Sequence, residues 1–383
     1  MNRRSAFIAL TMTLAMVTLA RSGHELPVYP SFYPHEIELA TVAPEPAAEL
    51  LQAGKIQAYV GRAPRFAATP PATVDRVESL GSFITVRVNP SSPRTRDARS
   101  ACAIAEGVVR DLAGKSADLI VHPYPVTPFH GDYLHHVDLA EAAKARILGS
   151  DPNAFDPIAQ DLKVKTSSEF ARSLVRPEWR AGGSAWEVEI AEVPAAQLVA
   201  NASIAMNGWL GPPWLRTGWF QAYLLLREQV GDANLKQRTE SQAQRLQTSA
   251  YDDVAERINL ERSLVAALAD NCYTRVAGYT IKREYFSTIF TAGIENIAYD
   301  SLVGFNSPIF IRTVKLRDFP WNGWLALGID AAPVAAWNPI AGFTDDFGRL
   351  MWFAVGDPAW IPSPYEAGWI INRISDVQSS AKQ

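Results

Sequence analysis

The chain has 383 residues, of which 48% are hydrophobic, and a formal net charge of −4 from 36 basic and 40 acidic side chains. This length allows two domains of ordinary size, each with a hydrophobic core. The near balance of charge gives no electrostatic basis for a nucleic-acid partner, so we expect none.

Residues 1–22 have the three parts of a secretory signal peptide. Arg3 and Arg4 precede an uncharged apolar run over residues 6–20, and the small residue Ser22 follows. The run is shorter than the roughly 20 residues that span a bilayer. We therefore expect a periplasmic or secreted protein with no transmembrane segment in the mature chain. An uncleaved membrane anchor is the alternative.

Hydrophobic periodicity predicts alternating strands and helices before residue 150. Strands are expected near residues 37–41, 56–60, 84–88 and 119–121, where apolar side chains alternate or form short runs. A short helix is expected with Pro46 near its first turn and Gly54 just past its end. Further helices are expected over residues 104–112 and from an N-cap at Asp138 to residue 148. This order favours an α/β layer with some parallel pairing.

The second half has a different pattern. Helices are expected over residues 217–230 and from an N-cap at Ser249 or Asp252 to residue 271, with a polar helix or connection over 231–248. Residues 309–311 are expected to begin a strand. The segment 319–369, rich in Trp, Pro and Gly, is expected to be irregular structure packed over a core.

Histidine and tryptophan are unevenly distributed. All six histidines lie between His24 and His136, and all eleven tryptophans lie between Trp179 and Trp369. We therefore predict an α/β or α+β protein with an N-terminal strand–helix layer and a helical, Trp-rich C-terminal part. The predicted boundaries are residues 23–150 for the first domain, 151–180 for a linker or transition, and 181–383 for the second domain.

Cys102 and Cys272 are the two cysteines of the chain. In an oxidising compartment an isolated pair of cysteines often forms a disulfide. Such a bond would connect the two predicted halves. Two buried free thiols are the alternative.

The strongest local signal is a cluster of imidazoles and carboxylates after the expected strand 119–121. Its members are His122, His130, Asp132, His135, His136 and Asp138. Imidazole and carboxylate are the usual ligands of Zn, Fe, Mn and oxidised Cu. In open α/β sheets, ligands gather beyond the carboxyl ends of strands. We therefore predict a site here for a transition metal such as Zn, Cu or Fe, with His122, His130 and one of the two adjacent histidines as the first ligands.

Two other interpretations of this cluster stay open. Its spacing matches no known metal motif, and neighbouring His135 and His136 point in different directions in any regular structure. The histidines could instead transfer protons or bind a ligand without a metal, or simply hydrogen-bond the loop. No nucleophile elbow, dinucleotide-binding fingerprint or phosphate-binding loop is present in the sequence.

Aromatic residues suggest a second kind of site. Trp209 and Trp214 lie among Gly and Pro residues, and Tyr124 lies in the Pro-rich segment after His122. Exposed aromatic rings of this kind stack on flat ligands or form protein interfaces. The alternative is that these rings fill the core.

The sequence supports three functional hypotheses. The first is an exported soluble protein that binds a metal ion or small ligand at the His- and Asp-rich loop. The second is a periplasmic solute-binding protein, for which two lobes with a chain that crosses between them are expected. The third is a non-catalytic subunit of an envelope complex, so the expected partner is a small molecule or an envelope protein. Whether the protein is an enzyme stays undecided; if it is, a metal-activated water or a redox metal is the expected mechanism.

Overall fold

The computed structural model describes residues 34, 36–149, 161–179, 185–200, 212–289, 292–318, 323–334, 345–356, 358–372 and 374. The predicted signal peptide and Trp209 lie outside these residues. Within them the fold mixes helices with one large sheet, which confirms the predicted fold class. None of the described helices is long and apolar enough to cross a membrane.

The large sheet has the strand order β1-β10-β2-β7-β3-β6-β5, and β4 also pairs with β7. Its strands are β1 (Glu36–Thr41), β2 (Ala58–Val60), β3 (Val74–Val88), β4 (Leu119–Val121), β5 (Val164–Thr166), β6 (Val188–Pro194), β7 (Thr274–Ser287) and β10 (Trp324–Ile329). The pairs β1–β10, β10–β2 and β5–β6 are parallel, whereas β3 and β7 pair in an antiparallel direction with each other. Strands from both predicted domains therefore share this sheet, and the division at residues 151–180 stays a prediction.

The helices surround the sheet. They are α2 (Pro44–Gln52), α3 (Ala98–Leu112), α4 (Val137–Leu148), α5 (Glu169–Leu174), α6 (Ala195–Ala200), α7 (Gly218–Leu226), α8 (Ala233–Gln247), α9 (Val254–Ala269), α10 (Pro308–Thr313) and α11 (Asp346–Val355). Short 3-10 turns include η2 (Tyr133–His135) and η5 (Pro213–Arg216). Two small antiparallel sheets of two strands complete the described fold: β8 (Ile294–Asn296) with β9 (Lys315–Leu316), and the hairpin of β11 (Trp360–Pro362) with β12 (Trp369–Ile371).

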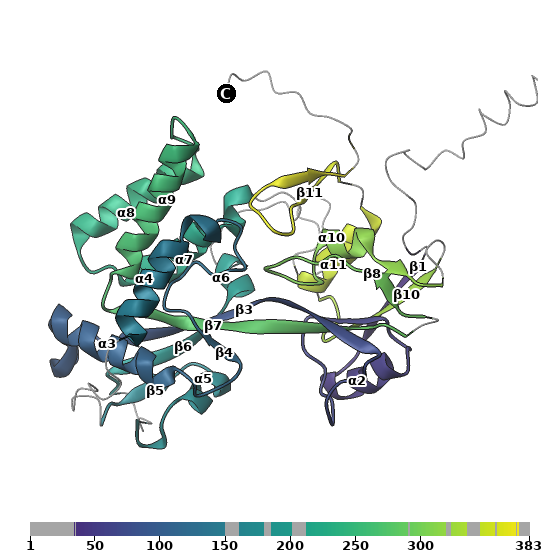
Figure 1. Ribbon diagram of the computed structural model, residues 1–383, viewed down its shortest axis with the longest axis horizontal. Helices are drawn as coiled ribbons and strands as arrows, with labels where there is room; N and C mark the ends of the chain where they lie inside the picture. The colour runs from purple at the N-terminus through teal and green to yellow at the C-terminus, as the bar shows by residue number, and fades with distance from the viewer. Residues whose placement is uncertain are drawn as a thin grey trace, which may run out of the picture.

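The chain forms two lobes that share the two longest strands, β3 and β7 (Figure 1). The elements β1, α2, β2 and those from β8 to β12 form one lobe, which we call the terminal lobe because it holds both ends of the described chain. The elements from α3 to α9 form the other, which we call the middle lobe. Strand β3 runs from the terminal lobe into the middle lobe, and β7 returns, so the described segments cross between the lobes twice.

The crossing strands are irregular where they pass between the lobes. The register of β3 and β7 shifts between Leu80 and Phe83 and again between Ile84 and Thr85. A Cβ at Gly81 would lie 2.6 Å from the Thr280 hydroxyl oxygen, and the same hydroxyl accepts a hydrogen bond from the Ser82 N–H at 2.9 Å. Bulges of this kind bend and twist a strand locally. The sequence therefore builds a bend into the ribbon at the lobe boundary.

Each lobe has its own hydrophobic cores. In the middle lobe, alternate residues of β3 face opposite sides: Phe83 packs beneath α7 to α9, and Ile84, Val86 and Val88 pack against α3 and α5. In the terminal lobe, α10 and α11 cover one face of the sheet and α2 covers another region. This alternation is the period of two that the sequence showed around residues 84–88.

Several predicted elements are confirmed. The expected strands near residues 37–41, 56–60, 84–88 and 119–121 correspond to β1, β2, β3 and β4. The expected helices before residue 150 correspond to α2, α3 and α4, and those after residue 217 to α7, α8 and α9. Parallel pairing is also present, although the parallel neighbour of β1 and β2 is β10 from the other end of the chain.

Other expectations are wrong. Residues 309–311 belong to helix α10 because Pro308 stands at its first position and the Ser307 hydroxyl accepts from the Phe310 N–H. Helix α9 is capped by Asp253, whereas Ser249 and Asp252 lie before the cap. Asp138 lies inside the first turn of α4 rather than at its N-cap. The segment 319–369, expected to be irregular, contains β10, α11 and the β11–β12 hairpin.

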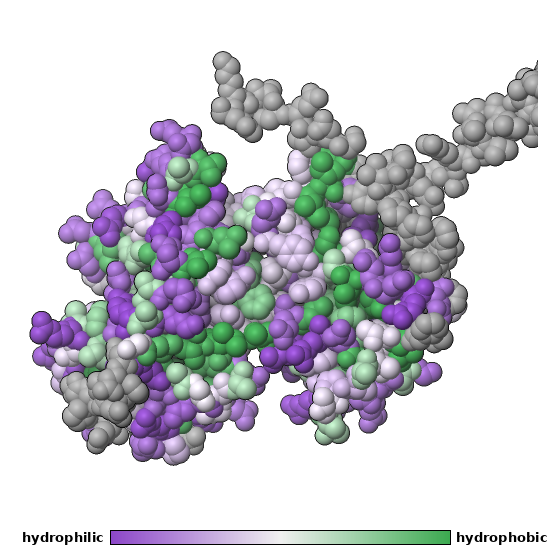
Figure 2. Space-filling view, viewed as in Figure 1, coloured by the Kyte–Doolittle hydropathy of each residue, from purple (hydrophilic) through white to green (hydrophobic). Residues whose placement is uncertain are grey.

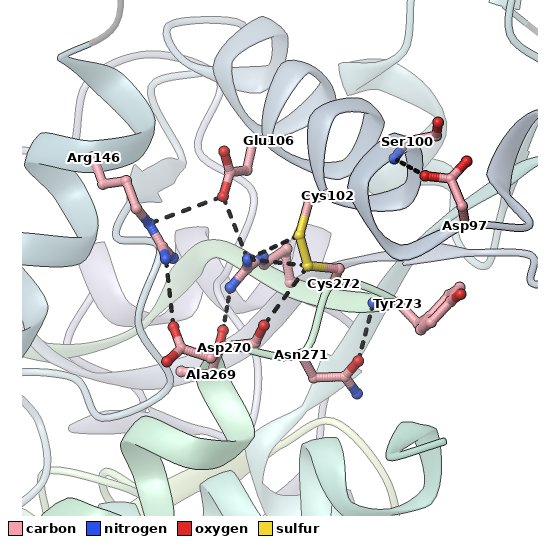
Figure 3. The surroundings of a disulfide bond; sticks show 11 residues. Asp97, Ser100, Cys102, Glu106, Arg146, Ala269, Asp270, Asn271, Cys272 and Tyr273 are labelled. Atoms are coloured by element: carbon pink, nitrogen blue, oxygen red, sulfur yellow. Dashed lines mark hydrogen bonds and ion pairs between the residues drawn. A yellow bond between two sulfur atoms is a disulfide. The ribbon is translucent and has the colours of Figure 1, made fainter. Parts of the chain in front are cut away.

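The two cysteines are joined. A disulfide connects Cys102 on α3 with Cys272 between α9 and β7, across 170 residues of sequence (Figure 3). The buried guanidinium of Arg275 lies 3.8 Å and 3.7 Å from the two sulfur atoms and bonds the Glu106 carboxylate at 3.3 Å. The bond therefore fastens α3 to the start of the crossing strand β7, both within the middle lobe.

Candidate functional site

The His-rich loop follows β4 and is held by hydrogen bonds of its own rings. The His122 Nε2–H donates to the Val126 carbonyl at 2.9 Å. His130 Nδ1 accepts from the Thr127 N–H at 3.0 Å, so its Nε2 carries the proton and donates to Gln221 Oε1 at 3.1 Å. Burial lowers the pKa of both histidines. Both imidazoles therefore act as neutral braces of the loop, and neither nitrogen of His130 is available without loss of one of these bonds.

Asp132 joins this loop to helix α7. Its carboxylate accepts from the Gly218 N–H at 2.7 Å and from the Trp219 N–H at 3.1 Å, and the side chain is buried. These are the first amides of α7, which have no partner within the helix. A carboxylate at a helix N-terminus is also favoured by the helix dipole. Asp132 thus caps a helix that begins 86 residues further along the chain.

The adjacent pair His135 and His136 diverges as expected of neighbours. His136 is fully buried, and its Nδ1 shares a hydrogen bond of 2.9 Å with the Tyr124 hydroxyl, while burial lowers its pKa to about 4. His135 is half-buried, and its Nδ1 lies 3.8 Å from Oε2 of Glu261 on α9. Burial raises the pKa of Glu261 to about 7, although its ion pair with Arg257 opposes that shift.

Asp138 faces outward. Its two carboxylate oxygens accept from the two terminal nitrogens of Arg262 at 2.7 Å each, and the side chain is two-thirds exposed. Hydrogen bonds from Arg262 lower the pKa of this carboxyl to about 2. The pair ties the start of α4 to α9 at the surface.

The six predicted metal residues therefore lie between the end of β4 and the first turn of α4, but the structure gives them separate partners. In the part of the chain that the structure describes, no three His, Cys, Asp or Glu side chains are arranged to hold a metal ion. Metal binding at His122, His130, Asp132, His135, His136 and Asp138 stays a prediction.

The two predicted aromatic residues within the described chain take different positions. Tyr124 is 2% exposed and lies in the middle-lobe core, where burial raises its pKa. Trp214 on η5 is half-buried, and its ring lies 4.6 Å from that of Phe220 and 6.4 Å from that of Trp219. A role of either residue in binding a ligand stays a prediction.

The contact between the two lobes contains a second cluster of charged side chains. It is built around residues 299–305 of the terminal lobe, which we call the junction turn. Asp300 of this turn is 2% exposed and forms an ion pair with Arg216 of the middle lobe. Leu302 of the same turn packs into the middle-lobe core. The turn is thus anchored across the lobe boundary by both a charge and an apolar side chain.

Glu284 on β7 supports the junction turn from below. Its carboxylate is fully buried and accepts from the Gly61 N–H at 2.7 Å and the Phe305 N–H at 2.8 Å. Lys282 lies 3.1 Å from this carboxylate and donates to the Val303 carbonyl at 3.1 Å. Gly304 has φ +69°, and a Cβ there would lie 1.8 Å from the Glu284 carboxylate, so only glycine fits.

A further lobe contact lies at the tip of the β11–β12 hairpin. A Cβ at Gly131, in the His-rich loop, would lie 2.5 Å from Cα of Glu366, so the two backbones touch. The Ser301 N–H donates to the Pro364 carbonyl at 3.0 Å, which links the hairpin to the junction turn. Figure 2 shows pale, neither strongly polar nor apolar residues over the centre where the lobes meet, and a notch in the outline between the lobes on the side of α2.

The residues of this junction were missed by sequence reasoning. Arg216, Lys282, Glu284 and Asp300 are scattered over 85 positions and belong to no motif. Two signals were available: the β-branched and aromatic residues of 274–287, which mark a strand, and the Asp-to-Gly spacing of 300–304, which marks a turn. Neither signal shows which lobe the turn contacts.

Comparison with known proteins gives structural similarity only. No protein-family model matches the chain, and no curated protein matches it in sequence. Among solved structures, the oligopeptide-binding protein AppA of Bacillus subtilis is similar at 12% identity and TM-score 0.40, over 72% of this chain and 59% of that chain. The periplasmic murein tripeptide-binding protein MppA gives 14% identity and TM-score 0.40, over 71% and 55%. NikZ of Campylobacter jejuni, solved with a nickel–histidine complex, gives 11% identity and TM-score 0.34, over 67% and 56%. The chain spans between half and two thirds of the length of each of these proteins.

Proposed function

We propose that this protein is an extracytoplasmic solute-binding protein that takes a small ligand between its two lobes. The observation that carries the proposal is the double crossing: among the described segments, the long strands β3 and β7 connect the lobes, and their register shifts at the boundary. Two lobes joined by a narrow ribbon can change their relative angle while each core stays intact. Ligand sites occur preferentially at such domain interfaces.

Location outside the cytoplasm is part of this proposal. The basic and apolar segments of residues 1–22 support it, and so does the Cys102–Cys272 disulfide, because disulfides persist in oxidising compartments. A small molecule is the proposed partner. An envelope protein that receives the liganded form is the second proposed partner.

The experiment is a search for solutes that change the lobe arrangement. Protein purified from its native envelope is unfolded, and the released small molecules are identified by mass spectrometry and added back. We expect a decrease in the radius of gyration by small-angle X-ray scattering and a change in tryptophan emission. Trp214, two residues before Arg216, is expected to report binding, so Trp214→Phe should remove most of the emission change. Trp324→Phe, at a ring that is 74% exposed outside the junction, should retain it. A released solute that binds without changing either signal contradicts the proposal.

A further inference from the structure

Part of the space between the lobes is occupied by the chain itself. The junction turn enters from the terminal lobe, and its Leu80–Ser301 and Lys282–Val303 hydrogen bonds fix it directly over the crossing strands. Asp300 Oδ1 accepts from the N–H groups of Leu302 and Val303 at 2.8 Å and 3.2 Å, which leaves Oδ2 for Arg216. The turn therefore presents one carboxylate oxygen to the opposite lobe.

The charges at this place balance only when the turn is docked. Arg216 and Lys282 contribute two positive charges, and Asp300 and Glu284 contribute two negative charges. The Glu284 carboxylate already bonds to Lys282 and to the backbone N–H groups of Gly61 and Phe305. When Asp300 leaves, Arg216, whose side chain is 20% exposed, loses this carboxylate partner and the site carries one excess positive charge. A partly buried guanidinium in that state favours an oxyanion.

We propose that the solute is an anion and that its carboxylate or phosphate group replaces the Asp300 carboxylate on Arg216. The inference rests on the function proposed above and specifies the chemistry of its ligand. Docking of the turn and binding of the anion are mutually exclusive, because the anion takes the place that the Asp300 carboxylate occupies beside the guanidinium. The docked turn thus competes with the anion for Arg216. The apparent affinity is the intrinsic affinity multiplied by the fraction of molecules in which the turn is undocked.

The test uses two junction variants and one matched control. Asp300→Asn removes the competing charge and keeps the side-chain volume, and Arg216→Gln removes the proposed anion ligand. Asp111→Asn is the control, because Asp111 is as buried as Asp300, at 4% against 3%, and pairs with Arg176 inside the middle lobe. The probes are succinate, citrate and inorganic phosphate, with succinamide and glucose as uncharged comparators. Binding is measured by calorimetry, and lobe separation by small-angle X-ray scattering.

We expect at least one anionic probe to bind Asp300→Asn about tenfold more tightly than the wild type, and Arg216→Gln about tenfold more weakly, a difference of ~1.4 kcal/mol per step. The carboxylate and phosphate probes show which oxyanion is preferred. Without any probe, Asp300→Asn should have a larger radius of gyration than the wild type and than Asp111→Asn.

Three results would overturn the inference. The first is that no anionic probe binds Asp300→Asn, the second that Arg216→Gln binds the anion as tightly as the wild type, and the third that Asp300→Asn leaves the radius of gyration unchanged. If uncharged solutes close the lobes equally well in the wild type and Arg216→Gln, the solute-binding function stands and the anion inference fails. If no solute of any charge, including those released from the native protein, changes the lobe separation, the function itself fails.

Discussion

The His-rich loop and the lobe junction both concentrate polar side chains, yet they differ in where the partners lie. In the loop, the rings of His122 and His130 bond to groups of the middle lobe, the lobe that carries them. At the junction, Arg216 bonds to Asp300 of the other lobe. Partners within one lobe fix its internal structure, whereas partners in different lobes can separate when the lobes move.

The two regions therefore mark a candidate site in different ways, one by the density of ligand-type residues in the sequence and the other by the location of their partners. Four histidines within 15 positions suggested a site, and the rings of three of them, His122, His130 and His136, bond to groups of the middle lobe. The junction residues carry no sequence motif. They form a cluster because the junction turn of the terminal lobe contacts the middle lobe.

The largest expected effect is at the junction, where Gly304→Ala places a methyl group against the Glu284 carboxylate in a left-handed backbone conformation. We expect a loss of about 3 kcal/mol in the free energy of unfolding, measured in urea. Gly114→Ala is the control, because Gly114 has φ +77° but open space around its Cβ. It should cost about 1 kcal/mol. Equal losses in the two variants would show that the junction is not tightly packed.

Glu261 gives a pH-dependent test of the loop side. Its pKa is about 7 in the folded protein, against 4.5 for the unfolded chain. The contribution of Glu261 to the free energy of unfolding is therefore fully present below pH 4.5, where its carboxyl is neutral, and is lost as the pH rises through 7. Glu261→Gln keeps the neutral form, so it should gain about 2 kcal/mol over the wild type between pH 4 and pH 8. The opposite contribution of His136 is present in both proteins and cancels. A difference independent of pH contradicts this account of Glu261.

A smaller effect is expected at the cap of α7. Asp132→Ala removes the acceptor of two buried amides and should cost about 1–2 kcal/mol, measured as a shift in the urea midpoint. Asp138→Ala should cost less than about 1 kcal/mol, because its ion pair with Arg262 is largely exposed. Equal costs would mean that Asp132 does not act as a cap.

The hypothesis of a metal site in the His-rich loop predicts the metal content of the purified protein rather than its stability. It predicts a near-stoichiometric transition metal in protein purified without a histidine tag, released in a His122→Ala, His130→Ala double variant that still folds. Elemental mass spectrometry measures this. Absence of metal from the wild type after reconstitution with Zn, Cu, Fe and Mn contradicts the proposal.

The sequence predicted local elements well and their assembly poorly. Strands β1 to β4 and helices α2 to α4 were visible as periodic apolar patterns with Pro and Gly at the ends. Strand β7 was missed, although it is the strand that pairs with β2, β3 and β4. Its partners lie about 150 to 230 residues away, and the β-branched and aromatic residues of 274–287, which mark a strand, do not show which strands it pairs with.

The candidate sites show the same limit. The disulfide between Cys102 and Cys272 could be foreseen because two cysteines allow a single pairing. The bonds of Gln221 to His130 and of Asp132 to Gly218 could not, since they depend on how α7 packs against the loop. Helix α10 was mistaken for a strand because Ile309, Phe310 and Ile311 are all buried, and a short apolar run does not distinguish the two structures.

The central claim is that the lobes move about the ribbon of β3 and β7. The direct measurement is the distance distribution between spin labels at Val254→Cys in the middle lobe and Val355→Cys in the terminal lobe, both at exposed positions. We predict that Asp300→Asn has a broader distribution with longer distances than the wild-type background. The distances should become shorter again when a solute released from the native protein is added. A single distribution that neither the substitution nor any solute alters would contradict the account.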